Sequence, residues 1–481
     1  MVFDTTWPIK FKYRGGQNML HCFMKRYSSH LCVFDNDVGN TNGYQTNEGK
    51  RLSMDTIIKM KDDNKVHKST EQTNSGIVHI GAGNFHRSHQ ESYLNELLAH
   101  DFEQNKNWLY TGISVLETDA ELQRNLKRNM YKYHIISIDP NGMTKVEEIK
   151  TLKDFVLTSE NLLSALSLIC DEKIKIVSLT ITEPGYATEL NDYDGKLIQS
   201  CLSNKPLSYE GTVTAFGIII AGLARRYSLG LRPFTLMSCD NLIKNGDVCR
   251  KKCLTAVLSL NLSDDFKHWM KNEVRYPNTM VDRITPYLSK DEIVDLEKKF
   301  SLIDQSPVVC ESYKSWVIED NFVDNQRPSW EKVGTVLTDD VEPYEFIKIF
   351  LLNVPHSCIA YAGLNKKYEY VHEAIGDPEI HDLLNRMIID EVFPILQRNI
   401  GEVIDWKSYY VQTIKRFKNS HVKDRLDRIA RDGLEKLKKQ GVKLLKEGLR
   451  HGIEMNNFKK FLDMWLSAVN VSHSDFFPEF T

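Results

Sequence analysis

The sequence predicts an α/β fold in which a doubly wound parallel sheet domain is followed by an all-helical C-terminal domain. Strand-like and helical patterns alternate between residues 76 and 340, which is typical of a parallel sheet with helices on both faces. A glycine turn joins the first strand pattern to the first helical pattern. From residue 341 to residue 481 the apolar residues recur about every 3.6 positions, which predicts helices.

The predicted elements of the sheet domain follow one another in a regular order. Ile77, Val78 and Ile80 form a short apolar run, and Leu94 and Leu97 lie on one face of the helix after it. The sequence predicts strands at 76–80, 108–116, 174–182 and 233–238, with helices over 85–100 and 213–227. We therefore expect domains at 76–340 and 341–481.

Residues 1–75 differ from the rest of the chain. They are rich in Asn, Asp, Lys, Thr and Gly and have few periodic apolar positions. Such a segment cannot bury enough apolar surface to fold, so we expect a flexible N-terminal extension. Residues 19–34 are basic and free of acids, so a transit peptide is the alternative.

Length, charge and cysteine content exclude several classes of protein. The chain has 481 residues, 41% hydrophobic and 26% charged, as in a soluble protein of two or more domains. A net charge of −3 gives no basic field for nucleic acid, and no apolar run reaches the roughly 20 residues of a membrane span. The nine cysteines include no CxxC pair, so we expect reduced packing residues and no metal. We expect a cytoplasmic monomer whose partner is a small-molecule substrate.

The glycine turn is Gly81-Ala82-Gly83-Asn84-Phe85, which follows Ile80. Glycines let the backbone turn tightly and approach a pyrophosphate, which the start of the next helix then faces. His86 stands where the usual third glycine would be. The turn indicates a Rossmann-type nucleotide site formed by the six residues from Ile80 to Phe85. The alternative is a strand–helix turn without a ligand.

Two acids follow the second predicted strand, Glu117 and Asp119. A dinucleotide-binding fold usually places an acid there to accept the hydroxyls of the adenosine ribose. The same charge repels a 2′-phosphate, so the acids favour NAD over NADP. Either acid could instead be an ordinary carboxylate at a helix N-terminus.

Lys348 lies in an apolar helical segment with Asn353 and His356. On an α-helix Asn353 falls about 140° and His356 about 80° round from Lys348, so the three can share a face. Apolar neighbours disfavour the charged amine and lower its pKa, which suits a general base. The alternative is a lysine that extends to solvent. Pro355 removes a backbone N–H and is expected to kink this helix.

From about Gly76 onward several separate motifs follow one another along the chain. They are IGAGNFHRSHQ from Ile80, SLTITEPGY from Ser178, SCDN from Ser238, MVDRITP from Met280, PVVCESYKSWVIEDNF from Pro307, RPSWEKVG from Arg327, TDDVEPYEFIKIFLLN from Thr338 and HEAIGDP from His372. In these motifs and their order the chain resembles the long-chain, zinc-independent mannitol dehydrogenases, which are polyol-specific long-chain dehydrogenases.

The resemblance implies roles for the residues near the reacting carbon. Lys348 resembles the family's general base. Asn241 and Asn353 resemble the pair that binds the developing alkoxide, and fixed donors aimed at forming charge lower a barrier. His356 resembles a residue that orients the substrate. From sequence alone, Asn241 could instead cap a helix, and His356 could be a core histidine.

The resemblance also implies residues that bind the substrate and select the coenzyme. Asp282 matches a position near the substrate, and Arg428 and Lys436 match positions that reach its hydroxyls. Asp119 matches the acid that selects NAD. The alternatives are an ion pair between Asp282 and Arg283 and a solvated helix face for the two cations.

Together these expectations describe NAD-dependent oxidation of a polyol, D-mannitol to D-fructose and the reverse, without a metal. Relatives that act on fructuronate, tagaturonate or arabinitol are the alternative within the same class. A catalytically silent NAD-binding protein is the alternative outside it.

Overall fold

The computed structural model describes residues 73–205, 211–402 and 404–470. Within them the chain divides into two compact units. The sheet unit contains the chain up to Lys348 together with Asn419–Arg425, and the helical unit contains Ile349–Lys418 and the chain from Leu426. The extension predicted for residues 1–75 lies almost entirely outside the described residues.

The sheet unit is built on five parallel strands in the order β5-β2-β1-β6-β7. The first strand, β1, lies in the middle of this sheet. The strands β2 and β5 then extend the sheet on one side, and β6 and β7 extend it on the other. The order therefore reverses between β1 and β6, the switch point at which doubly wound sheets bind ligands. The predicted fold class is confirmed. The strands are β1 (Ser75–Ile80), β2 (Leu109–Ser114), β5 (Leu152–Leu157), β6 (Ile176–Leu179) and β7 (Thr235–Ser238).

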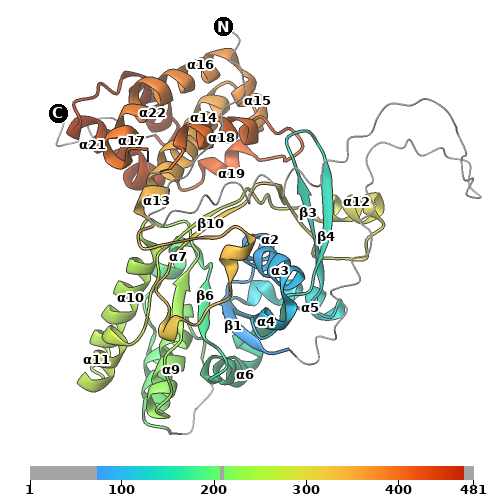
Figure 1. Cartoon of the computed structure of the whole chain (residues 1–481), viewed down its shortest axis with the longest axis vertical. Coiled ribbons are helices and arrows are strands. Elements are labelled where there is room, and N and C mark those ends of the chain that lie inside the picture. The colour runs from blue at the N-terminus through green and yellow to red at the C-terminus, as the bar shows by residue number, and fades with distance from the viewer. Residues whose placement is uncertain (1–72, 206–210, 403, 471–481) are drawn as a thin grey trace, which may run out of the picture. The chain divides into compact units, whose positions relative to one another are not determined.

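Helices cover both faces of this sheet (Figure 1). Ile77 and Val78 are adjacent in β1 but belong to different hydrophobic clusters, because successive strand side chains point to opposite faces. The cluster of Val78 includes most of α9 (Ala215–Ser228), and the cluster of Ile77 includes α3 (Gln90–His100). Burial on both faces explains why Ile77 and Val78 follow one another in an apolar run of the sequence.

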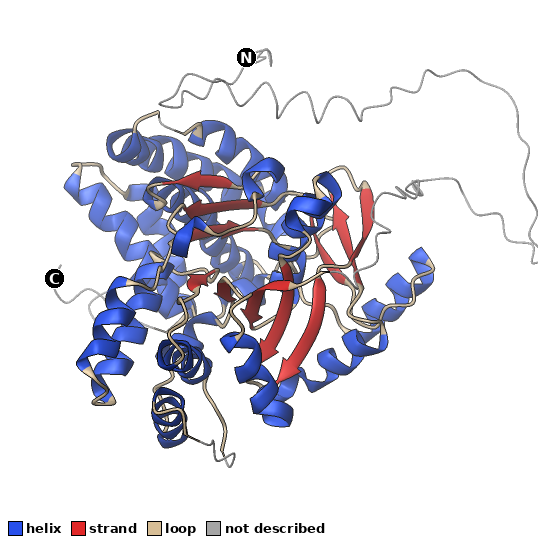
Figure 2. Cartoon of the chain, turned by 60° about the horizontal axis from the view of Figure 1, so that its bottom comes forward, coloured by secondary structure: helices blue, strands red, loops and turns tan. Residues whose placement is uncertain are grey.

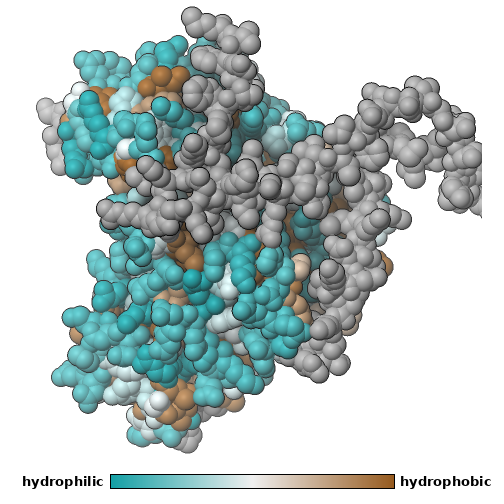
Figure 3. All heavy atoms as spheres, viewed as in Figure 1, coloured by the Kyte–Doolittle hydropathy of each residue, from teal (hydrophilic) through white to brown (hydrophobic). Residues whose placement is uncertain are grey.

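The other helices of the sheet unit are shorter or more exposed. In Figure 3 the surface over α10 (Asn245–Ser259) and α11 (Asp264–Asn272) is mostly hydrophilic. The remaining α-helices are α2 (Asn84–Ser88), α4 (Phe102–Asn105), α5 (Ala120–Arg128), α6 (Thr158–Cys170), α7 (Thr182–Ala187), α8 (Asp192–Leu202), α12 (Lys290–Phe300) and α13 (Glu342–Lys348). Three short 3₁₀ turns are η2 (Glu117–Asp119), η3 (Val323–Asn325) and η4 (Trp330–Val333).

Two further three-stranded sheets were not predicted. The strands, red in Figure 2, fall into separate groups and not into one continuous sheet. One small sheet has the order β4-β3-β9 and the other β11-β10-β8. Their strands are β3 (Tyr133–Ile138), β4 (Thr144–Ile149), β8 (Thr279–Asp282), β9 (Val308–Glu311), β10 (Ser315–Glu319) and β11 (Val336–Thr338).

The helical unit is rich in helices among its described residues, as predicted, and none of the strands of the three sheets lies in it. Most of its buried side chains belong to helices that are apolar on one face. Its α-helices are α14 (Val354–Asn365), α15 (Val371–Gly376), α16 (Pro378–Arg386), α17 (Phe393–Ile400), α18 (Trp406–Phe417), α19 (Leu426–Ala430), α20 (Gly433–Lys436), α21 (Val442–Arg450) and α22 (Asn456–Ala468).

Three π-helical turns interrupt these described helices, η5 (Ile349–Asn353), η6 (Met387–Val392) and η7 (Leu437–Gly441). Pro355 and Pro394 are each the second residue after a π-turn. Proline has no N–H for the usual bond to the carbonyl four residues earlier. A π-turn shifts those bonds by one residue, so the helix is irregular at the place where the sequence predicted an effect of Pro355.

The helix that runs from Glu342 to Asn365 is, within the described residues, the one that is long and apolar enough to cross a membrane. However, 83% of its most apolar window is buried inside the folded chain. That burial is the behaviour of a core helix.

Candidate active site

The two glycines of the turn after β1 have different surroundings. Gly81 has a φ of +89°, and a Cβ there would lie 2.3 Å from the carbonyl oxygen of Thr180. Its N–H donates to the carbonyl of Ile113 at 3.0 Å, which ties the turn to β2. A Cβ on Gly83 would find only one atom within 4 Å, the carbonyl oxygen of Gly81 at 3.9 Å. This open space before α2 fits the close approach of a pyrophosphate.

The other residues predicted to bind the cofactor lie in the glycine turn or beside it. Ile80 and Ala82 are buried, and Asn84 and Phe85 are half-buried at the start of α2. The Oδ1 of Asn84 accepts a hydrogen bond from Nη2 of Arg87 at 2.7 Å. Buried neighbours and the hydrogen bond from Arg87 therefore fix the turn, while Gly83 is exposed to solvent.

A chain of hydrogen bonds beneath the turn fixes the Gly81 peptide. The Thr180 hydroxyl donates to the Gly81 carbonyl at 2.8 Å. It must therefore accept from Nε2 of His79, which lies 2.8 Å away. That assignment leaves Nδ1 of His79 as the acceptor for the Ser178 hydroxyl, at 2.8 Å.

Replacing Thr180 with valine is expected to weaken NADH binding about tenfold. The variant removes the donor to Gly81 and leaves the Nε2–H of buried His79 without an acceptor, a loss of roughly 1–3 kcal/mol. Titration of NADH by its fluorescence gives the dissociation constant. Thr111→Val is the matched control, since it removes another buried hydroxyl, bonded to Ser75 at 2.7 Å. Equal effects of the two variants would exclude this role for Thr180.

His86, in place of the third glycine, belongs to a buried polar cluster. Its ring stacks on His79 with centroids 3.4 Å apart, and its Nε2 lies 3.1 Å from Oε1 of Glu91. Burial lowers the pKa of His86 to about 3 and raises the pKa of Glu91 to about 7. Both shifts favour neutral side chains, and the Thr151 hydroxyl donates to the other oxygen of Glu91 at 2.9 Å.

Acidification is expected to destabilise the sheet unit. Burial lowers the pKa of His79 well below its usual range and lowers those of His86 and His89 to about 3. An unfolded histidine has a pKa of about 6.5, so below pH 6.5 the unfolded chain binds more protons than the folded chain does. The contribution of these histidines to stability is therefore fully present above pH 6.5 and is lost as the pH falls toward 3. Glu91 acts in the opposite direction, because its folded pKa is raised.

Each group contributes about 1.4 kcal/mol per pH unit, so these four groups together lower stability by roughly 2–3 kcal/mol per unit between pH 6 and 5. Urea unfolding at several pH values measures this slope. His89→Gln keeps a donor for the Ser315 carbonyl, which His89 Nε2 contacts at 2.8 Å, and should reduce the slope by one group. A stability that does not change from pH 6.5 to 5 would contradict the neutral histidines.

The loop after β7 is locked by Asp240, which the sequence analysis did not single out. Its carboxylate accepts the N–H groups of Ile181 and Thr182 at 3.1 and 2.8 Å and the hydroxyl of Tyr186 at 2.8 Å. Thr182 has a φ of +60°, rare for a β-branched residue. Asp240 thus joins the SLTITEPGY and SCDN motifs at adjacent strand ends.

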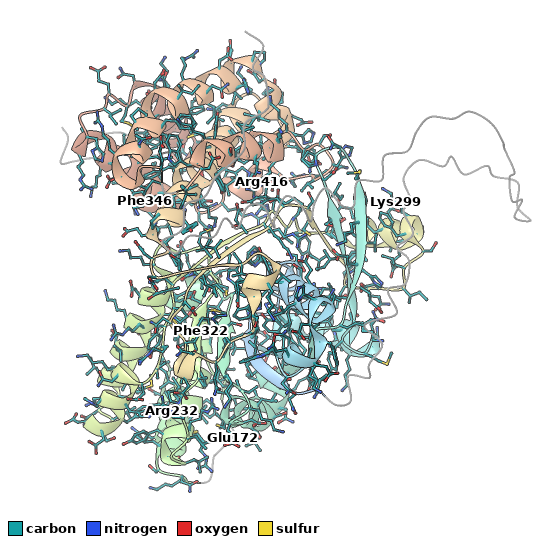
Figure 4. The ribbon with its side chains drawn as sticks, in the orientation of Figure 1. Glu172, Arg232, Lys299, Phe322, Phe346 and Arg416 are labelled. Atoms are coloured by element: carbon teal, nitrogen blue, oxygen red, sulfur yellow. The ribbon has the colours of Figure 1, made fainter. Side chains whose placement is uncertain are left out.

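Lys348 and Asn241 meet at this loop. The Nζ of Lys348 donates to Oδ1 of Asn241 at 2.6 Å. Lys348 is only 8% exposed, whereas Asn241 is exposed. Phe346, labelled in Figure 4, is likewise buried on α13, two residues before the lysine. The structure therefore does not place Lys348 as a solvated lysine.

Glu345 anchors α13 to the same loop and was also missed from the sequence. Its Oε1 accepts the backbone N–H of Lys244 at 2.8 Å, and Lys244 has a φ of +50°. Glu345 lies three residues before Lys348, so it is one helical turn away on a neighbouring face. The signal available in the sequence was an acid three residues before the candidate lysine, next to apolar residues.

Asp282 is the last residue of β8, Arg283 follows it, and the two side chains have different surroundings. Asp282 is buried and pairs in register with Ser315 of β10. The Nε of Arg283 donates to the carbonyl of Glu311 at 3.0 Å, and its Nη1 donates to the carbonyl of Ser88. Arg283 therefore ties β8 to the end of α2 through backbone carbonyls.

The remaining predicted site residues belong to the helical unit. Asn353 is the last residue of the π-turn η5. His356, on α14, stacks on Phe417 with centroids 4.9 Å apart. Arg428 is half-buried on α19. The Nζ of Lys436 donates to the carbonyl of Ile429 at 2.6 Å, so one of its donors serves the fold.

The acids after β2 also differ from each other. Glu117 is exposed, whereas Asp119 is half-buried and accepts the Ser114 hydroxyl at 2.6 Å. Of the two acids, Asp119 is therefore the one whose carboxylate is fixed by a hydrogen bond.

Among the residues that the structure describes, no three His, Cys, Asp or Glu side chains converge as metal ligands would.

Comparison with known proteins agrees with this architecture. The family model described as mannitol dehydrogenase Rossmann domain matches residues 75–332, and that of the mannitol dehydrogenase C-terminal domain matches residues 340–474. A mannitol 2-dehydrogenase of Phaeosphaeria nodorum is 35% identical over 370 residues, 76% of this chain. The chain spans 64% of that relative's length.

Two solved structures share the fold. The Pseudomonas fluorescens mannitol 2-dehydrogenase, solved as a ternary complex with NAD and D-mannitol, has a TM-score of 0.72 and 35% identity, covering 82% of this chain and 79% of that one. A substrate-free D-sorbitol dehydrogenase has a TM-score of 0.73 and 30% identity, covering 83% and 81%. The chain therefore belongs to the mannitol dehydrogenase family.

Proposed function

We propose that this protein is an NAD-dependent polyol dehydrogenase that interconverts D-mannitol and D-fructose. The observation that carries the proposal is the buried amine of Lys348 donating to the exposed amide of Asn241 at 2.6 Å. Family membership supports it, as does the solved relative whose complex holds NAD and D-mannitol.

The proposed cofactor site is the glycine turn. Gly81 and Gly83 admit the pyrophosphate, with Ile80, Ala82, Asn84 and Phe85 around it, and Asp119 accepts the ribose hydroxyls. NAD supplies a nicotinamide that accepts a hydride from carbon. A negative carboxylate at Asp119 disfavours the 2′-phosphate of NADP by like-charge repulsion.

In the oxidative direction, unprotonated Lys348 takes the proton of the reacting hydroxyl. The carbon–hydrogen bond breaks with its electron pair leaving as hydride for the nicotinamide, and the carbon–oxygen double bond forms. Because the oxygen of Asn241 is occupied by Lys348, the amide N–H₂ remains to donate to the forming alkoxide. A donor already aimed at developing charge lowers the barrier.

Further residues complete the proposal from the family resemblance. Asn353 is the second amide for the alkoxide and His356 orients the substrate. Asp282, Arg428 and Lys436 bind substrate hydroxyls. No metal takes part, because the amine supplies the base and the amides support the oxyanion. The enzyme acts as a cytoplasmic monomer.

A comparison of substrates tests the proposal. Purified full-length protein is assayed with NADH against D-fructose and against fructuronate, and with NAD against D-mannitol and D-arabinitol. We expect the highest kcat/KM with the fructose–mannitol pair. Turnover of fructuronate alone would replace the proposal with a hexuronate reductase, in which Arg428 would bind the carboxylate. NADH binding without turnover of any of the four would indicate a catalytically silent protein.

A further inference from the structure

We propose that Ser114 is a specificity-determining residue for the coenzyme, because it fixes the carboxylate of Asp119. The inference rests on the proposed use of NAD. It adds a residue that acts through Asp119, with no role in the chemical step. Three features of the end of β2 carry it.

The first feature is the orientation of the Ser114 hydroxyl. Ser114 ends β2 and is 2% exposed. Its Oγ accepts the backbone N–H of Leu116 at 3.1 Å. The single hydroxyl proton donates to Oδ2 of Asp119 at 2.6 Å. A buried hydroxyl whose acceptor and donor roles are both assigned holds its partner in one direction.

The second feature is that Asp119 does not cap its helix. It is the N-cap residue of α5, yet its side chain accepts no N–H from that helix. Other N-cap side chains of the sheet unit do accept such bonds, including Asn191, Thr214, Ser263 and Ser289. Within the described residues, the other carboxylate oxygen of Asp119 accepts no hydrogen bond. Ser114, and not α5, therefore sets the direction of this carboxylate.

The third feature is the position of the pair beside the glycine turn. Ile80 and Ile113 are register partners in β1 and β2, and Gly81 donates to the Ile113 carbonyl. Ser114 is the next residue of β2, so the carboxylate that it holds lies one strand from the turn. In a dinucleotide-binding fold the adenosine ribose occupies this position.

Loss of the hydroxyl should change affinity for the two coenzymes in opposite directions. A carboxylate released from Ser114 loses its fixed alignment with the ribose hydroxyls, so NADH binds more weakly. The same carboxylate can turn away from a 2′-phosphate, so NADPH is repelled less. A defect of folding alone would weaken both coenzymes together.

The test measures dissociation constants for NADH and NADPH by fluorescence titration of the full-length protein. Ser114→Ala is expected to lower the preference for NADH over NADPH about tenfold. Ser114→Thr, which keeps the hydroxyl, should retain most of the preference. In an Asp119→Asn background, Ser114→Ala should change the preference less than twofold, because its target is already neutral.

Three results would overturn the inference. They are an unchanged preference in Ser114→Ala, a parallel loss of both coenzymes, and an equal effect of Ser114→Ala with and without Asp119→Asn. If the parent protein binds neither coenzyme, the proposed function itself fails. If the parent binds NADH selectively and Ser114→Ala does so equally, only the role of Ser114 fails.

Discussion

Lys348→Ala is expected to lower kcat for polyol oxidation by about three orders of magnitude and to leave NADH affinity within twofold. A positioned general base contributes about 10²- to 10⁴-fold to rate. Lys348 is buried and held by Asn241 at 2.6 Å, and water in its place is a much weaker base than an amine. Steady-state kinetics with a parallel NADH titration separates loss of chemistry from loss of binding.

Two controls sharpen this experiment. A small primary amine such as methylamine should partly restore turnover to Lys348→Ala, because it returns a base to the vacated space. Lys366→Ala removes an amine that follows α14 and pairs with Asp377 and Glu379. That variant should keep its kcat within twofold. Full activity in Lys348→Ala would remove the lysine from the mechanism.

Gly217→Ala is expected to destabilise the sheet unit by about 3 kcal/mol or more. A Cβ at Gly217 would lie 1.8 Å from Oδ1 of Asp194, which is fully buried. The carboxylate accepts the N–H groups of Thr214 and Asn191, both at 3.0 Å, and the Thr214 hydroxyl at 2.9 Å. The methyl group would displace this carboxylate from the starts of α8 and α9.

Urea unfolding of the full-length protein measures the effect. Gly376→Ala is the matched control, since a Cβ there would find nothing within 4 Å. It should change the free energy of unfolding by less than about 1 kcal/mol. Equal stabilities of the two variants would contradict the packing of α9 against Asp194.

Local sequence patterns predicted four strands of the central sheet, but not its edge strand β5 or the two small sheets. β1 and β6 are apolar on both faces and flanked by turn residues, so their runs stand out. β4 is TKVEEI, with charged and polar residues facing out, and it resembles a surface loop. β3 pairs with β9 about 170 residues later, and no local pattern reveals such a partner.

The candidate site was predictable where one residue carries a recognisable role. Lys348 and Asn241 were found from motifs, and the structure brings them into contact. Asp240 was missed because its partners, Ile181 and Thr182, are backbone amides 58 or 59 residues away. The π-turn before Pro355 was not predicted, because it is defined by backbone hydrogen bonds that no local sequence pattern displays.

The most direct test of the central claim is reduction of NAD by D-mannitol, followed at 340 nm with EDTA-treated, full-length protein. The account predicts turnover that EDTA does not diminish and that Lys348→Ala lowers by about three orders of magnitude. It would be contradicted by absence of NADH formation from D-mannitol, or by activity that EDTA removes and zinc restores.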